Sequence, residues 1–255
     1  MLNTKILKNH QLDGNTFFLE GNNRSCVILV HGFTATSVEV RPLANFLNNA
    51  GYSVFGPLLP GHGTNPEDLN NCSWRDWVQS LQIEYESLKN SYKNIYIGGE
   101  SMGGVLSCYL AATNPKIRAI MLFAPAIKVE KLGLSRFIRF FKTSIPKKNF
   151  NDSTEIGTYP WQGYSVHPTK AAFQMYLLQR EVKKLLKKIV QPTIIFQGKF
   201  DKTISTQGPK MIYDSIQSYS KEFVFLENSG HCVLLEKDFN FLAEKTLDFI
   251  QKNGN

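Results

Sequence analysis

The chain of 255 residues contains no apolar run of about 18 residues, the length that a helix needs to cross a bilayer. Its opening stretch, MLNTKILKNHQLDGNT, also lacks the continuous apolar core of a secretory signal peptide. These two absences predict a protein with neither a membrane span nor an export signal, and we expect it in the cytoplasm.

Cysteine is scarce and scattered. The chain has four cysteines, and none of them forms a CxxC pair: Cys26, Cys72, Cys108 and Cys232. Clustered cysteines are the usual sign of a metal site or a disulfide framework, so neither is predicted here. We expect four reduced thiols, most of them in the core.

Acidic residues are scarce in one segment. Residues 127–190 hold thirteen Lys or Arg against four Asp or Glu, a balance of +9, so the rest of the chain carries −1 of the total charge of +8. A basic protein can bind nucleic acid, but this charge lies in a single segment and no nucleic-acid-binding module is recognisable. We therefore predict no nucleic-acid partner.

What the chain does contain is an alternation of short apolar runs with amphipathic stretches. This pattern predicts strands at 26–30, 52–55, 95–97, 117–123, 193–196 and 223–226, and helices at 43–50, 73–88, 102–113, 211–216 and 240–251. Such alternation is typical of the α/β class, in which a mainly parallel sheet is covered by helices on both faces. One core domain, made of residues 1–126 and 191–255, is predicted.

The alternation breaks between residues 127 and 190, where two stretches carry apolar residues at helical spacing. These are Leu134, Phe137, Ile138, Phe141 and Ile145 in the first stretch, and Leu178, Val182, Leu185, Leu186 and Ile189 in the second. We predict a helical cap, or lid, inserted into the core at 127–190. Both stripes need a surface to bury against, and the carboxyl edge of the sheet is the nearest one. Phe137 and Phe141 are therefore predicted to bind substrate.

The face opposite the first stripe is basic and carries Lys131, Arg139 and Lys142. Two interpretations stay open for this face. It is either a solvated surface of the cap, or a site of weak contact with anionic lipid.

The most specific motif is Gly99-x-Ser101-x-Gly103, which lies between a predicted strand and a predicted helix. A sharp turn there leaves no room for side chains at the two glycines, and it lifts the serine hydroxyl above the carboxyl edge of the sheet. The N-terminus of the following helix adds partial positive charge where an oxyanion would form. We predict that Ser101 is a nucleophile. The alternative is a surface serine in a glycine-rich connection.

A serine nucleophile needs a base and an orienting acid, which in this topology follow it in the order Asp or Glu, then His. Asp201 follows the strand at 193–196, and His231 follows the strand at 223–226. Both stand where loops leave the carboxyl edge of a parallel sheet, so we predict that they complete a triad. A helix-capping aspartate and a loop histidine bonded to backbone are the alternatives.

The other histidines are poorer candidates for the base. His10 precedes the sheet, His62 shapes a Gly-His-Gly turn, and His167 lies in the cap. His31 is better placed to brace the loop that follows the first core strand than to transfer protons.

An oxyanion hole requires two backbone N–H groups. One is expected from Met102, directly after the nucleophile, and the other from the loop 31–34, where Phe33 is the best candidate. The Phe33 ring would then line the acyl pocket. The alternative is an ordinary aromatic residue of the core.

Together these motifs resemble the compact bacterial carboxylesterases and monoacylglycerol lipases of the α/β-hydrolase superfamily. The matching segments, in order, are His31-Gly-Phe-Thr-Ala-Thr, Leu-Pro-Gly-His-Gly63, Gly-Glu-Ser-Met-Gly-Gly104, Gly198-x-x-Asp201 and Ser229-Gly-His231. They cover nearly the whole chain outside the cap, which carries no motif of the family. The resemblance implies a triad of Ser101, Asp201 and His231, oxyanion amides at Phe33 and Met102, no metal and no cofactor.

The activity expected from this resemblance is hydrolysis of short- or medium-chain acyl esters, or of monoacylglycerols, through an acyl-enzyme on Ser101. Aromatic esters of the feruloyl type, amide or C–C bond cleavage, and acyl transfer to another acceptor stay open within the same fold. Two rival classes are a non-catalytic protein that binds through the cap and a peripheral lipid-surface protein. A complete triad argues against the first, and salt-sensitive vesicle binding would identify the second.

Overall fold

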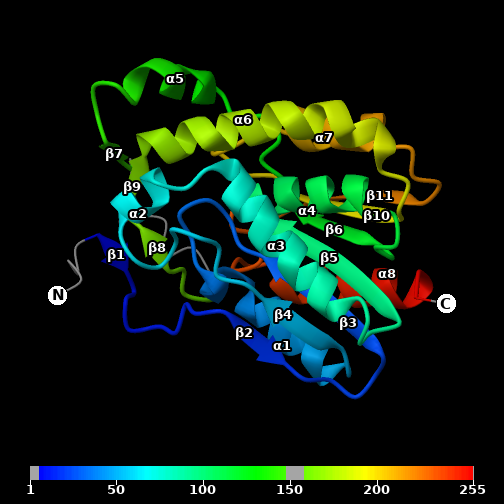
Figure 1. The fold of residues 1–255 in the computed structure, drawn as a ribbon. Helices are drawn as coiled ribbons and strands as arrows, with labels where there is room; N and C mark the ends of the chain where they lie inside the picture. Colours follow the sequence, from blue (N-terminus) through cyan, green and yellow to red (C-terminus); the bar gives the residue numbers. More distant parts are fainter. Residues whose placement is uncertain (1–5, 148–157, 255) are drawn as a thin grey trace.

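The structure is a computed structural model that describes residues 6–147 and 158–254. A seven-stranded sheet forms its centre, with the strand order β11-β10-β6-β5-β3-β4-β2 (Figure 1). The strands span Phe17–Leu19 (β2), Ser25–Val30 (β3), Ser53–Gly56 (β4), Asn94–Glu100 (β5), Ile120–Phe123 (β6), Thr193–Gly198 (β10) and Lys221–Leu226 (β11).

The sheet is parallel except at one edge, where β2 pairs antiparallel with β4. All residues of β3 are buried, as the continuous apolar run of this central strand predicts. The register sets Val30 of β3 opposite Gly99 of β5, and Phe123 of β6 opposite Glu100. The carboxyl ends of the three central strands therefore meet beside Ser101. The predicted α/β class with a mainly parallel sheet is confirmed.

Helices cover both faces of the sheet (Figure 1). On one face α1 packs against α8, and on the other α3 packs against α4. The helices of the core span Arg41–Asn49 (α1), Pro66–Asn70 (α2), Trp74–Leu88 (α3), Met102–Thr113 (α4), Gln207–Ser215 (α7) and Phe239–Lys252 (α8). Within the two described ranges, no helix is both long enough and apolar enough to cross a membrane.

Residues 127–190, which we call the inserted segment, connect β6 to β10. Its longest element is α6 (Thr169–Leu185), which packs on α4 and continues into η4 (Leu186–Lys188). The second predicted stripe lies on these two elements, except for Ile189, which directly follows η4. Its members Leu178, Val182, Leu186 and Ile189 are buried, so both the helix and its apolar face agree with the sequence pattern.

The first predicted stripe does not lie on one helix, and that prediction is wrong. The short helices η2 (Leu132–Leu134) and α5 (Ser135–Ile138) are followed by the strand β7 (Ser144–Pro146). Proline disfavours helical backbone at the residue before it, so Pro146 keeps Ile145 extended. β7 pairs with β9 (Val166–Pro168), and β8 (Gly163–Tyr164) pairs with β1 (Leu7–Lys8).

Four of the five side chains of the first stripe are exposed and Ile138 is half-buried, so the predicted burial of this stripe is also wrong. The exposed fraction is 61% for Phe137 and 85% for Phe141. α5 lies on the outer side of α6 (Figure 1), so it contacts α6 rather than the edge of the sheet. Only part of a short helix of this kind can be covered by a single neighbouring helix.

Candidate active site

Ser101 stands at the turn between β5 and α4. Its backbone has φ 54° and ψ −110°, a conformation that residues other than glycine rarely adopt. A Cβ atom at Gly103 would lie 2.0 Å from the carbonyl oxygen of Val30, and one at Gly99 would lie 2.4 Å from the carbonyl carbon of Gly103. The close packing of the turn therefore requires both glycines of the motif.

Ser101, His231 and Asp201 form one chain of hydrogen bonds. Nε2 of His231 lies 3.0 Å from Oγ of Ser101, and Nδ1 of His231 lies 2.8 Å from Oδ2 of Asp201. An ionised carboxylate can only accept, so Nδ1 carries the ring proton and Nε2 is left to accept from the serine hydroxyl. The three residues predicted to form a triad are brought together with the connectivity that a nucleophile, a base and an orienting acid require.

The carboxylate of Asp201 is fixed by donors on both oxygens. Oδ1 accepts from the backbone N–H groups of Thr203 at 2.8 Å and Ile204 at 3.0 Å, while Oδ2 accepts from Nε2 of Gln197 at 3.0 Å in addition to His231. The side chain is only 1% exposed. Asp201 therefore caps a turn through one oxygen and orients His231 through the other.

Burial alone would raise the pKa of Asp201 and lower the pKa of His231. The attraction between the two residues and their hydrogen bonds reverse both effects, so the pKa of Asp201 lies below its ordinary value and the pKa of His231 lies above it. Asp201 is ionised at neutral pH as a result. The imidazolium form of His231 is stabilised, which suits a base that has to hold a transferred proton.

The loop that contains Gly32 and Phe33 runs beside Ser101. A Cβ atom at Gly32 would lie 3.3 Å from Cβ of Ser101. Met102 is the first residue of α4, where backbone N–H groups have no acceptor within the helix. In the described ranges, neither the Phe33 amide nor the Met102 amide donates to an acceptor. Both amides can therefore donate to an oxyanion that forms at Ser101.

His31 braces this loop. Its Nδ1 donates to the carbonyl oxygen of Gly32 at 2.9 Å, and its Nε2 accepts from the backbone N–H of Leu59 at 3.1 Å. Burial lowers the pKa of His31 to about 4, so the ring stays neutral and keeps this tautomer. His62 lies edge-on to it with the ring centroids 4.8 Å apart, and burial also lowers the pKa of His62.

The Phe33 ring lies in a cluster of aromatic rings. Its centroid is 6.4 Å from that of Trp77, 6.5 Å from that of His62 and 6.5 Å from that of His167. His167 belongs to β9, so the inserted segment reaches the loop beside Ser101. His167 is exposed in β9, and partial desolvation and the charge of Lys147 lower the pKa of its ring. The sequence pattern predicts no role for His167.

Phe137 and Phe141 are not gathered into this cluster. They lie on α5 and in the turn after it, above the outer side of α6 (Figure 1). Any contact between these two side chains and a substrate, as the sequence predicts, would therefore form at the molecular surface.

The sequence analysis predicts no role for two acidic residues near the triad. Glu236 accepts from the backbone N–H groups of Gly230 and Cys232, on either side of His231. Glu39 is buried and accepts from the backbone N–H of Gly32. Neither acid belongs to a motif, and nothing in their local sequence distinguishes them from solvated glutamates.

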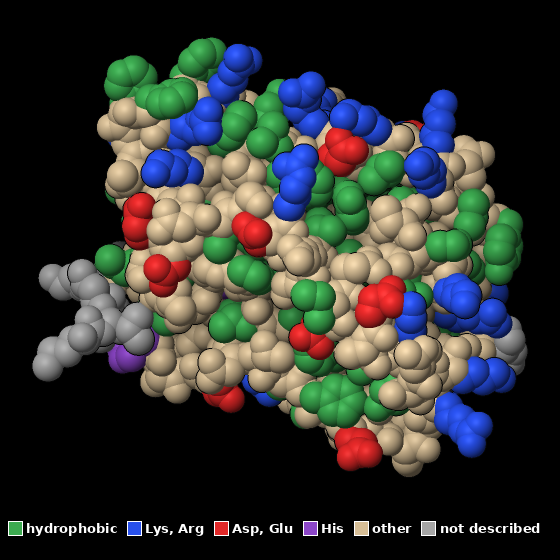
Figure 2. All heavy atoms as spheres, viewed as in Figure 1, with side chains coloured by type: hydrophobic (Ala, Val, Ile, Leu, Met, Phe, Trp, Pro, Cys, Tyr) green, Lys and Arg blue, Asp and Glu red, His purple; other side chains and the backbone are tan. Residues whose placement is uncertain are grey.

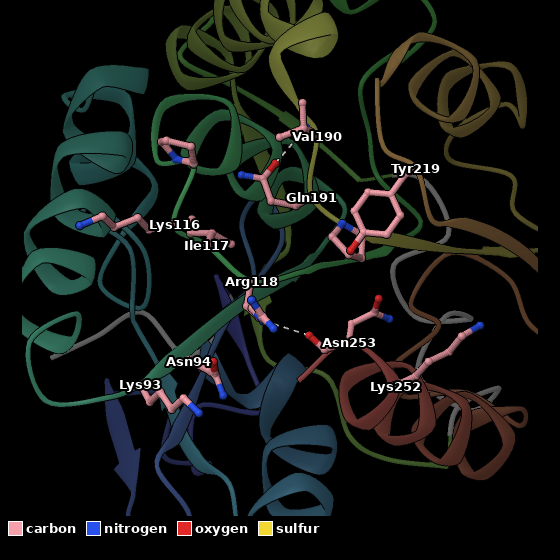
Figure 3. Close-up of a pocket in the computed structure, with 12 residues that line it drawn as sticks. Lys93, Asn94, Lys116, Ile117, Arg118, Val190, Gln191, Tyr219, Lys252 and Asn253 are labelled. Atoms are coloured by element: carbon pink, nitrogen blue, oxygen red, sulfur yellow. Dashed lines mark hydrogen bonds between the residues drawn. The ribbon is translucent and has the colours of Figure 1, made fainter. Parts of the chain in front are cut away.

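Figure 3 shows a hollow at the other end of the sheet. It is formed near the amino ends of β5, β6 and β10 by residues that include Asn94, Arg118 and Gln191. Arg118 donates to the backbone carbonyl of Asn253 on its rim. Ser101 stands at the carboxyl end of β5, so this hollow is no part of the candidate active site.

Known proteins resemble the chain over nearly its whole length. The family model described as serine aminopeptidase, S33, matches residues 21–162 and 164–238. A thermostable monoacylglycerol lipase of Bacillus sp. (strain H-257) is 34% identical over 95% of this chain and 97% of its own length. A carboxylesterase of Bacillus subtilis (strain 168) is 29% identical over 92% of this chain and 96% of its own.

Solved structures also resemble the chain over nearly its whole length. One from work on two metagenome-derived lipolytic enzymes, LipS and LipT, superposes with a TM-score of 0.86 and 28% identity, covering 94% of this chain and 99% of that one. The parallel sheet and the turn at Ser101 define an α/β hydrolase. The chain belongs to the serine aminopeptidase S33 family and, within it, to the bacterial carboxylesterases and monoacylglycerol lipases. The resemblance read from the motifs is confirmed.

Proposed function

We propose that the chain is a serine hydrolase that cleaves carboxylic esters through an acyl-enzyme on Ser101. The observation that carries this proposal is the hydrogen-bond chain from Ser101 through His231 to Asp201, with links of 3.0 and 2.8 Å. The relatives named as a monoacylglycerol lipase and a carboxylesterase support the same type of bond.

In the first step, Oγ of Ser101 attacks the carbonyl carbon of the ester while Nε2 of His231 takes the hydroxyl proton. Asp201 keeps the resulting imidazolium oriented. The carbonyl oxygen becomes an oxyanion, which the amides of Phe33 and Met102 bind. The bond to the alcohol oxygen then breaks, and His231 gives its proton to the departing alcohol.

In the second step, His231 takes a proton from a water molecule, which attacks the acyl carbon on Ser101. The same two amides bind the second oxyanion. The bond to Oγ breaks and His231 returns the proton to Ser101, so that one ester and one water yield one acid and one alcohol. Each proton transfer uses the Nε2 atom that lies within hydrogen-bond distance of Oγ.

The proposed substrates are short- or medium-chain acyl esters, or monoacylglycerols. The apolar ring of Phe33, in the loop beside Ser101, is only half-buried and suits an acyl chain. We further propose that the inserted segment acts as a cap, because His167 contacts Phe33 and Nζ of Lys147 donates to Oγ1 of Thr34 at 2.7 Å. Hydrolysis of feruloyl-type esters, or acyl transfer to another acceptor, is the alternative within this fold.

The test is a panel of acyl esters and monoacylglycerols graded by chain length, combined with labelling by a fluorophosphonate probe. The parent protein should hydrolyse part of the panel and label, whereas Ser101→Ala should lose both by several orders of magnitude and keep its melting temperature. A parent that neither labels nor hydrolyses any ester would favour a non-catalytic binding protein. Preferential cleavage of a feruloyl ester would favour the alternative.

As a second candidate function, we propose a weak contact between α5 and an anionic lipid surface. Three rings on and after this helix are exposed, at 61% for Phe137, 72% for Phe140 and 85% for Phe141. Hydrophobic and cationic side chains gather at this corner of the molecule (Figure 2), and the exposed cations include Arg136 and Lys142. Apolar rings that enter the interface beside cations that meet phosphate headgroups are typical of interfacial helices.

Sedimentation with vesicles tests this contact. Binding to vesicles that contain anionic lipid should exceed binding to neutral vesicles and should weaken as salt is added, since exposed charges are screened. Substitution of Phe137 and Phe141 by Ser should reduce binding at every salt concentration. Equal binding by the parent and this double variant would contradict the proposal.

We also propose that the protein works in the cytoplasm. All four cysteines are free thiols, which fits a reducing compartment. Fractionation of cells that express the tagged chain tests this location.

A further inference from the structure

The carboxylate of Glu39 joins the loop beside Ser101 to the inserted segment. Glu39 lies in η1 (Ser37–Val40) and is 3% exposed. Its Oε2 accepts from the backbone N–H of Gly32 at 2.5 Å, and its Oε1 accepts from the indole N–H of Trp161 at 3.0 Å. The steps of ester hydrolysis given above use neither oxygen, so both contacts still need an explanation.

The contact with Gly32 acts directly beside the amide of Phe33. A Cβ atom at Gly32 would lie 3.0 Å from Oε2 of Glu39 and 3.3 Å from Cβ of Ser101, so carboxylate, loop and nucleophile are packed with no space between them. Thr34, two residues on, has φ 66°, a strained conformation that must be held by its surroundings. A hydrogen bond from an ionised carboxylate is strong enough to hold such a loop in one place.

Glu39 also acts on the triad through its charge. Burial raises the pKa of Glu39 above its ordinary value, and the hydrogen bonds from Gly32 and Trp161 and the attraction of His231 and Lys147 limit this rise without cancelling it. Both oxygens accept from N–H donors, which is the pattern of an ionised carboxylate. In return, the charge of Glu39 acts to raise the pKa of His231, together with Asp201 and Glu236. The other titratable groups that interact with Glu39 are Glu100 and Cys232.

We infer that Glu39 is a positioning residue, which holds the oxyanion loop beside Ser101 through Gly32 and couples that loop to the inserted segment through Trp161. This inference rests on the proposed ester hydrolysis. The groups that touch substrate in that proposal are the amides of Phe33 and Met102, and Glu39 acts through the loop that carries the first of them.

Two substitutions separate the length of the Glu39 side chain from its charge. Glu39→Gln keeps the length of the side chain, removes its charge and turns an NH2 group toward one of the two N–H donors. Glu39→Asp keeps the charge but withdraws it from Gly32. We expect kcat to fall roughly tenfold or more in both, less than the loss of a whole oxyanion donor costs. KM should stay within about twofold, because the loop acts in the transition state.

The pH profile distinguishes positioning from a general loss of stability. Only Glu39→Gln should move the kinetic pKa of His231 to lower pH, because the imidazolium then loses a neighbouring negative charge. Fluorophosphonate titration counts the competent sites, so a variant that merely unfolds loses sites without a change in kcat per site. Glu67→Gln makes the same exchange at an exposed position on α2 and should leave kcat and the kinetic pKa unchanged.

Trp161→Phe removes one donor and leaves the charge, and it serves as the second variant should the Glu39 variants fail to fold. It should lower kcat at an unchanged kinetic pKa. A value of kcat per site within about twofold of the parent in every folded variant would overturn the inference. A parent that does not react with the fluorophosphonate would overturn the proposed function instead, so the two failures are distinguishable.

Discussion

The imidazole ring of His167 lies parallel to the phenyl ring of Phe33, with the centroids 6.5 Å apart and the planes inclined by 2°. The first ring belongs to β9 of the inserted segment and the second to the loop after β3. The segment in which no family motif could be found therefore contacts the residue whose amide is proposed to bind the oxyanion. The inserted segment, proposed above as a cap, and the proposed oxyanion loop therefore share one cluster of rings.

The first prediction concerns this stacking contact. His167→Ala removes a ring beside Phe33, and the space left should accept a longer acyl chain, with each added methylene contributing about 0.8 kcal/mol. The chain length with the highest kcat/KM should therefore increase. His167→Phe keeps a neutral ring and should keep the preference of the parent. An unchanged optimum in His167→Ala, measured on the same acyl series, would show that the ring does not shape the acyl site.

The second prediction concerns pH. His231 acts as a base only when it is deprotonated, and its pKa is raised above the ordinary value of 6.5. Activity should therefore rise with pH and reach half its maximum above that value. Asp201→Asn removes the charge that stabilises the imidazolium, so its residual activity should titrate at lower pH. A flat profile for the parent between about pH 5 and 8, on a substrate limited by chemistry, would contradict His231 as the base.

The third prediction concerns the turn at the nucleophile. Gly103→Ala would place a Cβ atom 2.0 Å from the carbonyl oxygen of Val30. Since this neighbour is backbone of the central strand and cannot move aside, we expect a loss of about 3 kcal/mol in the free energy of unfolding. Gly133→Ala is the matched control, because its Cβ atom would meet Tyr176 at an ordinary 3.4 Å. Denaturant melts of the two variants should differ clearly, and equal midpoints would contradict the account of the turn.

The fourth prediction concerns the cationic and aromatic side chains on and beside α5. Exchange of Lys131, Arg139 and Lys142 for Gln should leave kcat/KM for short soluble esters nearly unchanged, because η2 and α5, which these residues flank, contact α6 and not the edge of the sheet. The same variant should turn over substrate in anionic vesicles more slowly. Exchange of Phe137 and Phe141 for Ser should likewise leave kcat/KM for short soluble esters nearly unchanged and slow the turnover of substrate in anionic vesicles. A changed chain-length preference on soluble esters would instead show that these rings reach the acyl site.

Those parts of the site that depend on neighbouring residues in the sequence were predictable. Gly99 is demanded by its contact with Gly103 within one tight turn, although Gly103 itself is demanded by Val30 of the neighbouring strand. The triad order follows from strands that end at one edge. The apolar stripe from Leu178 to Ile189 is also local, because a helix that crosses a parallel sheet buries one regular face.

The remaining parts depend on contacts between distant residues. Glu39 and Trp161 are joined by one hydrogen bond although 122 positions separate them in the chain, and neither residue type signals such a partner in advance. The stripe from Leu134 to Ile145 has helical spacing, yet spacing alone does not decide whether a surface exists to cover it. Pro146 was the available sign that its last member is extended, since proline restricts the residue before it.

The path of α6 has a consequence for protein engineering. β6 and β10 are parallel neighbours, and parallel neighbours need a crossover connection that carries the chain back to the starting edge of the sheet. α6 makes that return while packed on α4. A minimal version of this hydrolase must therefore retain α6, and any exchange of residues before α6 must also keep the hydrogen bond from Trp161 to Glu39.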